Sequence, residues 1–236
     1  MLLEINHLTV RYRHRGSLAS LFDPAARRAV VAVNDVSLEL AAGETLGLIG
    51  ESGSGKSTLG RTIMGLERPD DGSIRFSGQE LVGLSEREYR LVRRDIAMIF
   101  QDAVGSLSPR KTVYELLAEP YLIHDDPRSN LRERTAEMLS AVGLEQDLLS
   151  ARPHQLSGGQ ARRVGIARAL ALDPKLIIAD EPTAGLDVSV QGEVVNLLNR
   201  LQLERQIAYL FITHNLAIAR HAVSYTHLTL PTNREV

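Results

Sequence analysis

The fold of this chain is decided by the stretch Leu46-Gly47-Leu48-Ile49-Gly50-Glu51-Ser52-Gly53-Ser54-Gly55-Lys56-Ser57-Thr58-Leu59. An apolar segment runs into a glycine-rich turn and then into a helical segment, which is the setting in which the G-x-x-x-x-G-K-[ST] pattern binds phosphate. The glycines allow a tight turn whose N–H groups point inward, and the start of the helix adds a partial positive charge. The simplest alternative is a tight strand-to-helix turn without a ligand. Because the lysine and the hydroxyl are also present, we predict a phosphate cradle built from Gly50, Glu51, Ser52, Gly53, Ser54, Gly55, Lys56, Ser57 and Thr58.

The composition is typical of a globular protein, with 236 residues, 44% hydrophobic and 24% charged residues. A formal net charge of −2 gives no reason to expect bulk attraction to nucleic acid or anionic lipid. Basic clusters, Arg162-Arg163 among them, are interpreted as solvated faces or partner contacts. The absence of cysteine excludes disulfides and thiolate metal sites. We see neither a signal peptide nor an apolar run of the ~18–20 residues that a membrane helix needs, and therefore expect any membrane role to depend on a partner.

Hydrophobic spacing predicts strands at 2–12 and 30–40, and a change of phase at Asn34-Asp35 indicates a bulge in the second. Segment 13–29 is interpreted as a loop inserted in this hairpin. Capping boxes at Ser85 and Thr112, and an N-cap followed by proline at Asp126-Pro127, predict helix starts. From Gln101 to about Gln160 the composition favours helices, which we interpret as a helical subdomain inserted into an α/β core. Strands and helices alternate again after this region, and this alternation predicts a mostly parallel sheet with its ligands at the carboxyl ends of the strands.

Polar side chains follow three of the predicted strands. The strand Leu176–Ala179 leads to Asp180 and Glu181, which would hold magnesium and polarise an attacking water, respectively. His214 comes after a second strand, where an imidazole could contact a γ-phosphate. Gln101 comes after a third and offers an oxygen to magnesium and an amide to the water. Acids or a histidine at strand ends are often only solvated turn residues, and it is the cradle that favours the functional interpretation.

A second helix start lies at Leu156-Ser157-Gly158-Gly159-Gln160. A glycine-containing helix N-terminus can bind an anion, but it can equally be a structural feature alone. One nucleotide does not need two such termini from one chain. If this terminus binds phosphate, the phosphate would belong to a nucleotide held by another subunit.

Taken together and in this order, the motifs resemble those of the ATP-binding subunits of ATP-binding cassette (ABC) transporters. The resemblance covers roughly Leu2 to Val223. It identifies Gly50–Ser57 as the Walker A motif, Gln101 as the Q-loop and Leu156–Gln160 as the signature. It also identifies Leu176–Glu181 as the Walker B strand with its catalytic glutamate, Ala184–Asp187 as the D-loop and His214 as the switch histidine. Tyr12 falls where the family places an aromatic ring under adenine, although a core aromatic in a strand is an alternative. The resemblance implies an α/β fold, namely a P-loop NTPase core of the ABC ATPase type with an antiparallel β subdomain and an inserted α-helical subdomain at about 102–160.

Within the family, the chain most resembles the ATPases of oligopeptide, dipeptide and nickel importers, through segments such as Phe100-Gln101-Asp102 and Ser106-Leu107-Ser108-Pro109-Arg110. This resemblance implies an ATPase that uses ATP and Mg²⁺, with Ser57, Gln101 and Asp180 as metal ligands and Glu181, His214 and Gln101 as catalytic residues. Two cassettes would close around two ATP molecules, each also contacted by the signature residues Ser157, Gly158, Gly159 and Gln160 of the facing chain. The D-loop residue Asp187 is a further nucleotide-binding candidate.

The implied partners are a second ABC ATPase subunit, two transmembrane permease subunits and, indirectly, a solute-binding protein, with no nucleic acid. The implied location is cytoplasmic and peripheral, on the inner face of the cell membrane. Two alternatives remain open at this point. One is a soluble ABC-type ATPase that acts on nucleic acid or the ribosome, and the other is an incomplete cassette that binds ATP without useful turnover.

The tail departs from the family pattern. We assign residues 1–223 to the ATP-binding domain and treat 224–236 as an atypical tail, which resembles translated read-through from a sequencing adapter; a divergent tail is the alternative. In both cases the family's C-terminal segment is replaced. We therefore expect one edge of the sheet to lack a neighbouring strand.

Overall fold

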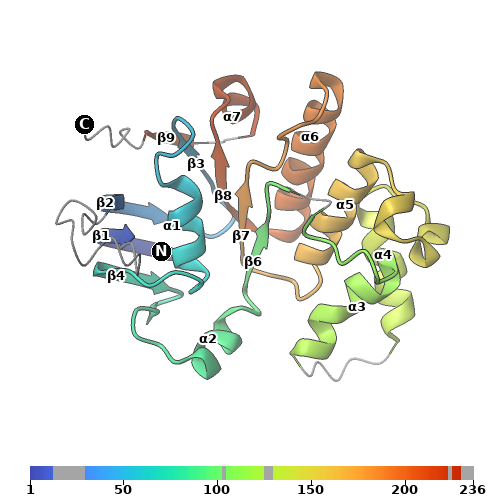
Figure 1. Ribbon diagram of the computed structural model, residues 1–236, viewed down its shortest axis with the longest axis horizontal. Coiled ribbons are helices and arrows are strands. Elements are labelled where there is room, and N and C mark those ends of the chain that lie inside the picture. The colour runs from blue at the N-terminus through green and yellow to red at the C-terminus, as the bar shows by residue number, and fades with distance from the viewer. Residues whose placement is uncertain (13–29, 103–104, 125–129, 223–224, 230–236) are drawn as a thin grey trace, which may run out of the picture.

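The structure is a computed structural model that describes residues 1–12, 30–102, 105–124 and 130–222, together with the backbone of 225–229. Figure 1 shows two sheets and a helical region. The elements in chain order are β1 (Leu3–Tyr12), β2 (Val30–Leu40), β3 (Thr45–Ile49), α1 (Lys56–Ile63), β4 (Asp71–Phe76), β5 (Gln79–Glu80), α2 (Glu86–Val92), β6 (Ile96–Ile99), α3 (Val113–Ile123), α4 (Leu131–Ala141), the 3₁₀ turns η3 (Gln146–Ser150) and η4 (Pro153–Gln155), α5 (Gly158–Ala169), β7 (Leu176–Asp180), α6 (Val188–Arg205), β8 (Ala208–Thr213), α7 (Leu216–Ala222) and β9 (Tyr225–Thr229).

The central sheet is parallel, with strand order β6-β7-β8-β3-β9. Strands β3, β7 and β8 are buried at every position, as expected for strands covered on both faces. One face packs on Leu59 and Ile63 of α1, and the other packs on α5 and α6 through residues such as Val164 and Leu198. Figure 1 shows α1 on one side of this sheet and α5 and α6 on the other. The predicted parallel sheet is confirmed.

The second sheet is antiparallel and has the order β2-β1-β4-β5. Ile5 of β1 pairs with Leu38 of β2 on one side and with Ile74 of β4 on the other. The register between β1 and β2 shifts near Asp35, which has a φ of 51° and donates its N–H to the Thr9 hydroxyl at 3.2 Å. The predicted bulge is therefore confirmed. The loop interpretation of 13–29 falls outside the described residues.

The helical region between β6 and α5 contains α3, α4, η3 and η4. The helix α3 begins with the capping box predicted at Thr112. Its Leu116 and Leu117 share a core with Leu139 of α4 and with α5, so the inserted helices pack against the central sheet through α5. The helix start predicted at Asp126-Pro127 falls outside the described residues, and α4 begins at Leu131 after Asn130. The α/β fold with an antiparallel subdomain and inserted helices is confirmed.

The backbone of 225–229 forms β9, which pairs in parallel with β3. Our expectation that this sheet edge lacks a neighbour is therefore wrong. A strand added to a sheet edge is held by main-chain N–H and C=O groups, which any extended segment without proline supplies, so a departure from the family sequence does not prevent the pairing.

Candidate functional site

The predicted cradle is the loop between β3 and α1. Gly53 and Gly55 have φ values of 84° and 90°, in the left-handed region that favours glycine. A Cβ at Gly55 would lie 1.9 Å from the carbonyl oxygen of Ala32 in β2, so packing as well as conformation requires glycine there. Gly55 is also the N-cap of α1, and no side chain caps this helix. The first N–H groups of α1 are therefore left for an anion, as the predicted phosphate site requires.

The side chain of Lys56 lies inside this loop and is 4% exposed. Its Nζ donates to the carbonyl oxygens of Gly50 at 2.8 Å and Glu51 at 2.6 Å and to the Ser54 hydroxyl at 3.2 Å. Burial lowers the pKa of Lys56, while the carboxylates of Glu181 and Asp180 act in the opposite direction. A buried ammonium held by neutral oxygens favours an incoming anion, and this chemistry fits a phosphate.

Ser57 and Asp180 meet although 123 positions separate them in the chain. The Ser57 hydroxyl donates to Asp180 Oδ1 at 3.0 Å, which joins the start of α1 to the end of β7. Burial raises the pKa of Asp180, while the hydrogen bond from Ser57 lowers it. A hydroxyl and a carboxylate oxygen are ligands that Mg²⁺ accepts, usually together with phosphate oxygens and waters. The described residues include no group of three or more His, Cys, Asp or Glu side chains suited to a metal.

Glu181, His214 and Gln101 meet at the carboxyl ends of β7, β8 and β6. His214 Nδ1 lies 2.8 Å from Glu181 Oε1, and Gln101 Nε2 donates to Glu181 Oε2 at 3.5 Å. The Glu181 side chain is 13% exposed and that of His214 is 59% exposed. Glu181 has a φ of 46°, and its N–H donates to the carbonyl oxygen of Ile212 at 2.9 Å. A positive φ at a non-glycine residue stores conformational energy and must be held by its surroundings, as is common at functional sites.

Tyr12 ends β1 and is 39% exposed. Its hydroxyl lies 3.4 Å from Thr58 Oγ1, so the ring lies beside the first turn of α1 and not in the core. Of the two interpretations of Tyr12, the buried core aromatic is therefore excluded.

The second helix start is separate from the cradle. Ser157 is the N-cap of α5, where its hydroxyl accepts the Gln160 N–H at 3.2 Å and Gln160 Oε1 accepts the Ser157 N–H at 2.9 Å. Within the described part of the chain, residues 157–160 make no hydrogen bond to 50–58. Asp187 lies at the N-cap of α6. The structure therefore brings together the cradle, Asp180, Glu181, Gln101 and His214, but not the second helix terminus.

Sequence reasoning missed Arg162, which we interpreted with Arg163 as part of a solvated or partner-contacting basic cluster. That interpretation is wrong for Arg162, which is 6% exposed and donates to the carbonyl oxygens of Gln101 and Ala184. The available signal was helical spacing, because Arg162 precedes the buried Ile166 by four positions and therefore shares its helix face.

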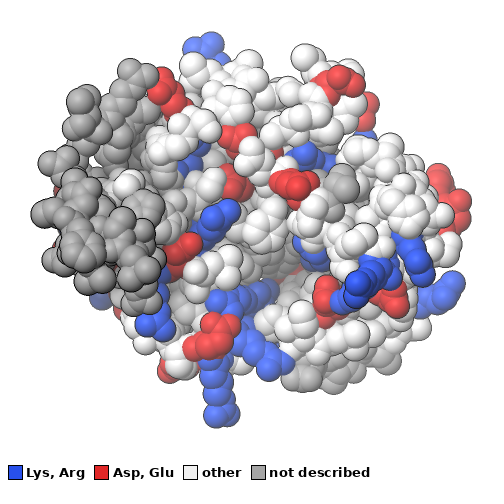
Figure 2. Space-filling view, in the orientation of Figure 1, with Lys and Arg blue, Asp and Glu red and all other residues white. Residues whose placement is uncertain are grey.

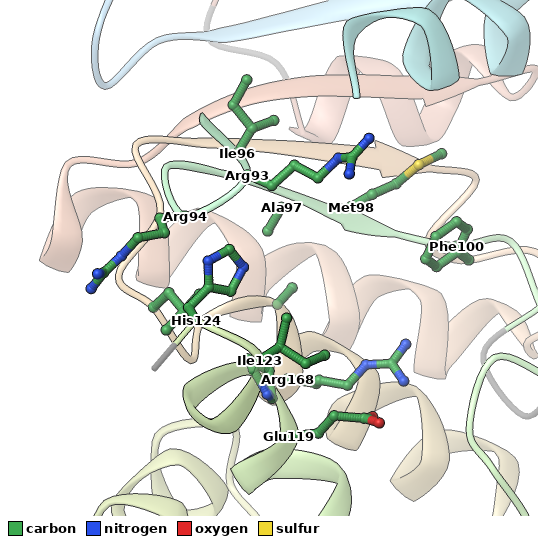
Figure 3. A pocket seen from close by; sticks show the side chains of 13 residues that line it. Arg93, Arg94, Ile96, Ala97, Met98, Phe100, Glu119, Ile123, His124 and Arg168 are labelled. Carbon is green, nitrogen blue, oxygen red and sulfur yellow. The ribbon is translucent and has the colours of Figure 1, made fainter. Parts of the chain in front are cut away.

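A groove of about 250 Å³ lies apart from the cradle, between β6 and the helical region. Figure 3 shows Met98 and Phe100 on the β6 side of the groove and Glu119 and Ile123 on the α3 side. Phe100 is 38% exposed and Ile123 is 52% exposed. The groove is therefore a mixed apolar and charged surface at the junction of the core and the inserted helices.

The matching family model is described as ABC transporter and covers residues 33–184. The oligopeptide transport ATP-binding protein OppF of Escherichia coli (strain K12) is 47% identical over 223 residues, which are 94% of this chain and 66% of that protein. The di/tripeptide transport ATP-binding protein DppF of Pseudomonas aeruginosa (strain UCBPP-PA14) is 46% identical over 210 residues, 89% of this chain and 64% of that protein. The chain thus spans about two thirds of the length of these relatives.

A solved structure of similar fold is the dimeric post-hydrolysis state of the ATP-binding cassette MJ0796 bound to ADP and Pi, with a TM-score of 0.80, 31% identity, and coverage of 93% of this chain and 90% of that one. The family match covers more than half of the chain, and the motifs lie on the same scaffold in the expected order. This chain therefore belongs to the ABC transporter family.

Proposed function

We propose that this chain is the subunit that binds and hydrolyses ATP for an ABC importer of peptides. The observation that carries the proposal is the contact of Glu181 with both His214 and Gln101, next to the Ser57–Asp180 pair and the cradle. A carboxylate at this place can accept a proton from a water aimed at a phosphate. The similar cassette that holds ADP and Pi supports the assignment of the cradle to ATP.

The residues of the site have separate roles in this proposal. The loop N–H groups of 50–58 hold the phosphates, and Lys56 exchanges its loop carbonyls for phosphate oxygens. Ser57, Asp180 and Gln101 hold Mg²⁺, which neutralises charge on the phosphates when bound. Glu181 takes the proton from water, and His214 and Gln101 keep its carboxylate in position. Tyr12 is exposed beside Thr58 and stacks on adenine.

The second cassette completes the site. Within the described residues, 157–160 make no hydrogen bond to the cradle of their own chain. We therefore propose that Ser157, Gly158, Gly159 and Gln160 bind the nucleotide held by a facing chain, with Asp187 at the same interface. The dimeric state of the similar cassette supports this arrangement. Hydrolysis would then require two cassettes, which are either identical or different chains.

Peptide transport is supported by the names of the relatives, which are ATP-binding proteins of oligopeptide and di/tripeptide transport. None of the described helices combines the length and the apolar character needed to cross a bilayer. From the transport role of these relatives, we propose a cytoplasmic subunit, peripheral on the inner face of the membrane, that docks on two permease subunits through the groove beside β6 and serves a solute-binding protein indirectly. On the face shown in Figure 2, acidic and basic side chains are interspersed and basic ones gather over α2. This pattern differs from the continuous basic stripe of a nucleic-acid-binding protein.

The site is tested by Glu181→Gln in the 236-residue chain, with Glu204→Gln as the control because Glu204 is an exposed residue of α6. We expect Glu181→Gln to lower the rate of MgATP hydrolysis by ~10²-fold or more while the protein still retains MgATP. The control should hydrolyse ATP at the parent rate. A Glu181→Gln variant that turns over like the parent would contradict the assignment of the general base.

The importer role is tested by purification from membranes. Co-purification with integral membrane subunits supports the proposal, whereas tight and salt-sensitive nucleic-acid binding in their absence contradicts it. Cooperative melting together with ATP hydrolysis by the isolated chain would exclude an incomplete cassette without useful turnover.

A further inference from the structure

Arg162 is a buried arginine whose contacts all lie at the edge of the candidate site. It belongs to α5, the helix that begins at the signature residues, and it is 6% exposed. Its Nη1 donates to the carbonyl oxygen of Gln101 at 3.1 Å and, more weakly, to that of Glu181 at 3.5 Å. Its Nη2 donates to the carbonyl oxygen of Ala184 at 2.7 Å. One guanidinium therefore joins α5 to the segments that follow β6 and β7.

The charge of Arg162 is held almost entirely by main-chain groups. Within the described residues it forms no ion pair, and its buried Nε has no hydrogen-bond partner. Burial lowers the pKa of Arg162, and Asp102 acts in the opposite direction. A buried cation with an unpartnered N–H is costly, since desolvation of a charged group must be offset by good hydrogen bonds. If this site needed only apolar packing, leucine or methionine would fill it better. We therefore interpret the guanidinium as a group that holds the carbonyl groups it contacts in place.

The segment that Arg162 holds is conformationally demanding. Glu181 has a φ of 46°, and its carbonyl oxygen also accepts the N–H of Ala184 at 3.0 Å, which closes a turn directly after β7. A residue in a sparsely populated φ region keeps that conformation only where its neighbours hold it. Arg162 contacts the carbonyl groups at both ends of this turn. Its loss would allow the peptide that carries the Glu181 carboxylate to relax.

We propose that Arg162 is a positioning residue for ATP hydrolysis, which sets the places of Glu181 and Gln101 relative to α5 through their backbone carbonyls. This inference rests on the proposed function and extends it to a residue that touches neither nucleotide nor water. Because α5 begins at the residues that would contact the facing chain's nucleotide, Arg162 also links that contact to the catalytic groups of its own chain.

The experiment compares Arg162→Met with Arg163→Met, a matched control on the same helix. The Arg163 side chain donates to the carbonyl oxygen of Val142 at 3.0 Å and pairs with Glu193 at 2.7 Å. Among the described residues, this side chain makes no hydrogen bond to Gln101, Glu181 or Ala184. We expect Arg162→Met to lower kcat by about 10- to 100-fold, because small misplacements of catalytic groups have effects of this size, while KM for ATP changes by less than about threefold. Arg163→Met should keep kcat within about threefold of the parent. Arg162→Lys should restore part of the lost rate, because an ammonium can reach one of the carbonyl oxygens but lacks the fork.

A double-mutant cycle separates positioning from a loss of folded protein. If Arg162 acts through Glu181, Arg162→Met should cost less than about threefold in a Glu181→Gln background, since the carboxylate that it positions is already gone. A purely structural role would lower the rate by the same factor in both backgrounds. Equal factors, or an unchanged kcat in Arg162→Met, would overturn the proposal.

Hydrogen exchange tests the same proposal without ATP turnover. Amides of 181–187 should exchange at least about tenfold faster in Arg162→Met than in the parent, and Arg163→Met should leave them unchanged. Unchanged exchange in Arg162→Met would contradict the proposal even if the parent proved inactive. If Arg162→Met exchanged faster than the parent but the parent had no ATPase activity, the proposed function would have failed while the positioning contact was real.

Discussion

Replacing single glycines by alanine separates two contributions to the free energy of unfolding, namely strain in a left-handed backbone and the steric clash of an added Cβ. Gly53, Gly55 and Gly78 all have φ values between 80° and 90°. An added Cβ would meet nothing within 4 Å at Gly53 and Gly78, whereas at Gly55 it would lie 1.9 Å from the carbonyl oxygen of Ala32. Gly78 lies in the turn between β4 and β5, away from the cradle, and serves as the control.

The expected magnitudes follow from these distances. An alanine in the left-handed region costs about 1–2 kcal/mol, which is the whole expected effect at Gly53 and Gly78. At Gly55 the new methyl group must also move from 1.9 Å to an ordinary contact of about 3.5 Å from a main-chain oxygen that belongs to a paired strand. Because overpacking of this kind adds about 1–3 kcal/mol, we expect Gly55→Ala to lower the free energy of unfolding by about 2–5 kcal/mol.

The assay is thermal unfolding of the three variants without nucleotide. For a chain of this length, about 1 kcal/mol corresponds to ~2–4 °C in Tm, so Gly53→Ala and Gly78→Ala should melt ~2–8 °C below the parent and Gly55→Ala ~4–20 °C below it. The reasoning would be refuted if Gly55→Ala lost no more stability than Gly78→Ala. Such a result would mean that β2 and the cradle loop do not pack as closely as the structure shows.

Four further variants test single groups. Burial raises the pKa of Asp180, so its ionisation opposes folding. Asp180→Asn should therefore raise the Tm of the nucleotide-free protein at neutral pH, and this gain in Tm should shrink as the pH is lowered and the parent carboxyl becomes protonated. A gain in Tm that grew on acidification would mean that folding lowers the pKa of Asp180 instead of raising it. Tyr209→Phe removes a buried hydroxyl that has no hydrogen-bond partner among the described residues, so the Tm should stay the same or rise by ~2–4 °C. A clear fall in Tm would reveal a partner for that hydroxyl. Ser157→Ala and Thr112→Ala each remove an N-cap and should cost about 1 kcal/mol in thermal unfolding, but only Ser157→Ala should also lower ATP hydrolysis. Equal ATPase rates in the two cap variants would count against the proposed role of the signature residues.

Local features were predictable because short-range physics determines them. The glycines of the cradle reflect backbone sterics within a few residues, and the capping boxes at Ser85 and Thr112 reflect hydrogen bonds over three residues. The bulge near Asp35 was visible as a change of phase in the alternation of apolar residues. For the same reason the parallel strands were recognisable as short apolar runs between helices.

Contacts between distant segments needed the tertiary structure. The sequence by itself determined which residue types follow each strand, and hence that Asp180, Glu181, Gln101 and His214 were candidates for one site. Only the order of the strands in the sheet decided that Ser57 lies 3.0 Å from Asp180, that Glu181 lies between His214 and Gln101, and that β9 covers the edge beside β3. The burial of Arg162 was decided in the same way, because its partners are carbonyl groups 19 to 61 positions away. Every residue has a main-chain carbonyl, so the sequence does not indicate which carbonyls will bind a side chain. The residue types therefore reveal the chemistry of the site, whereas only the packing of the folded chain reveals what holds the site in place.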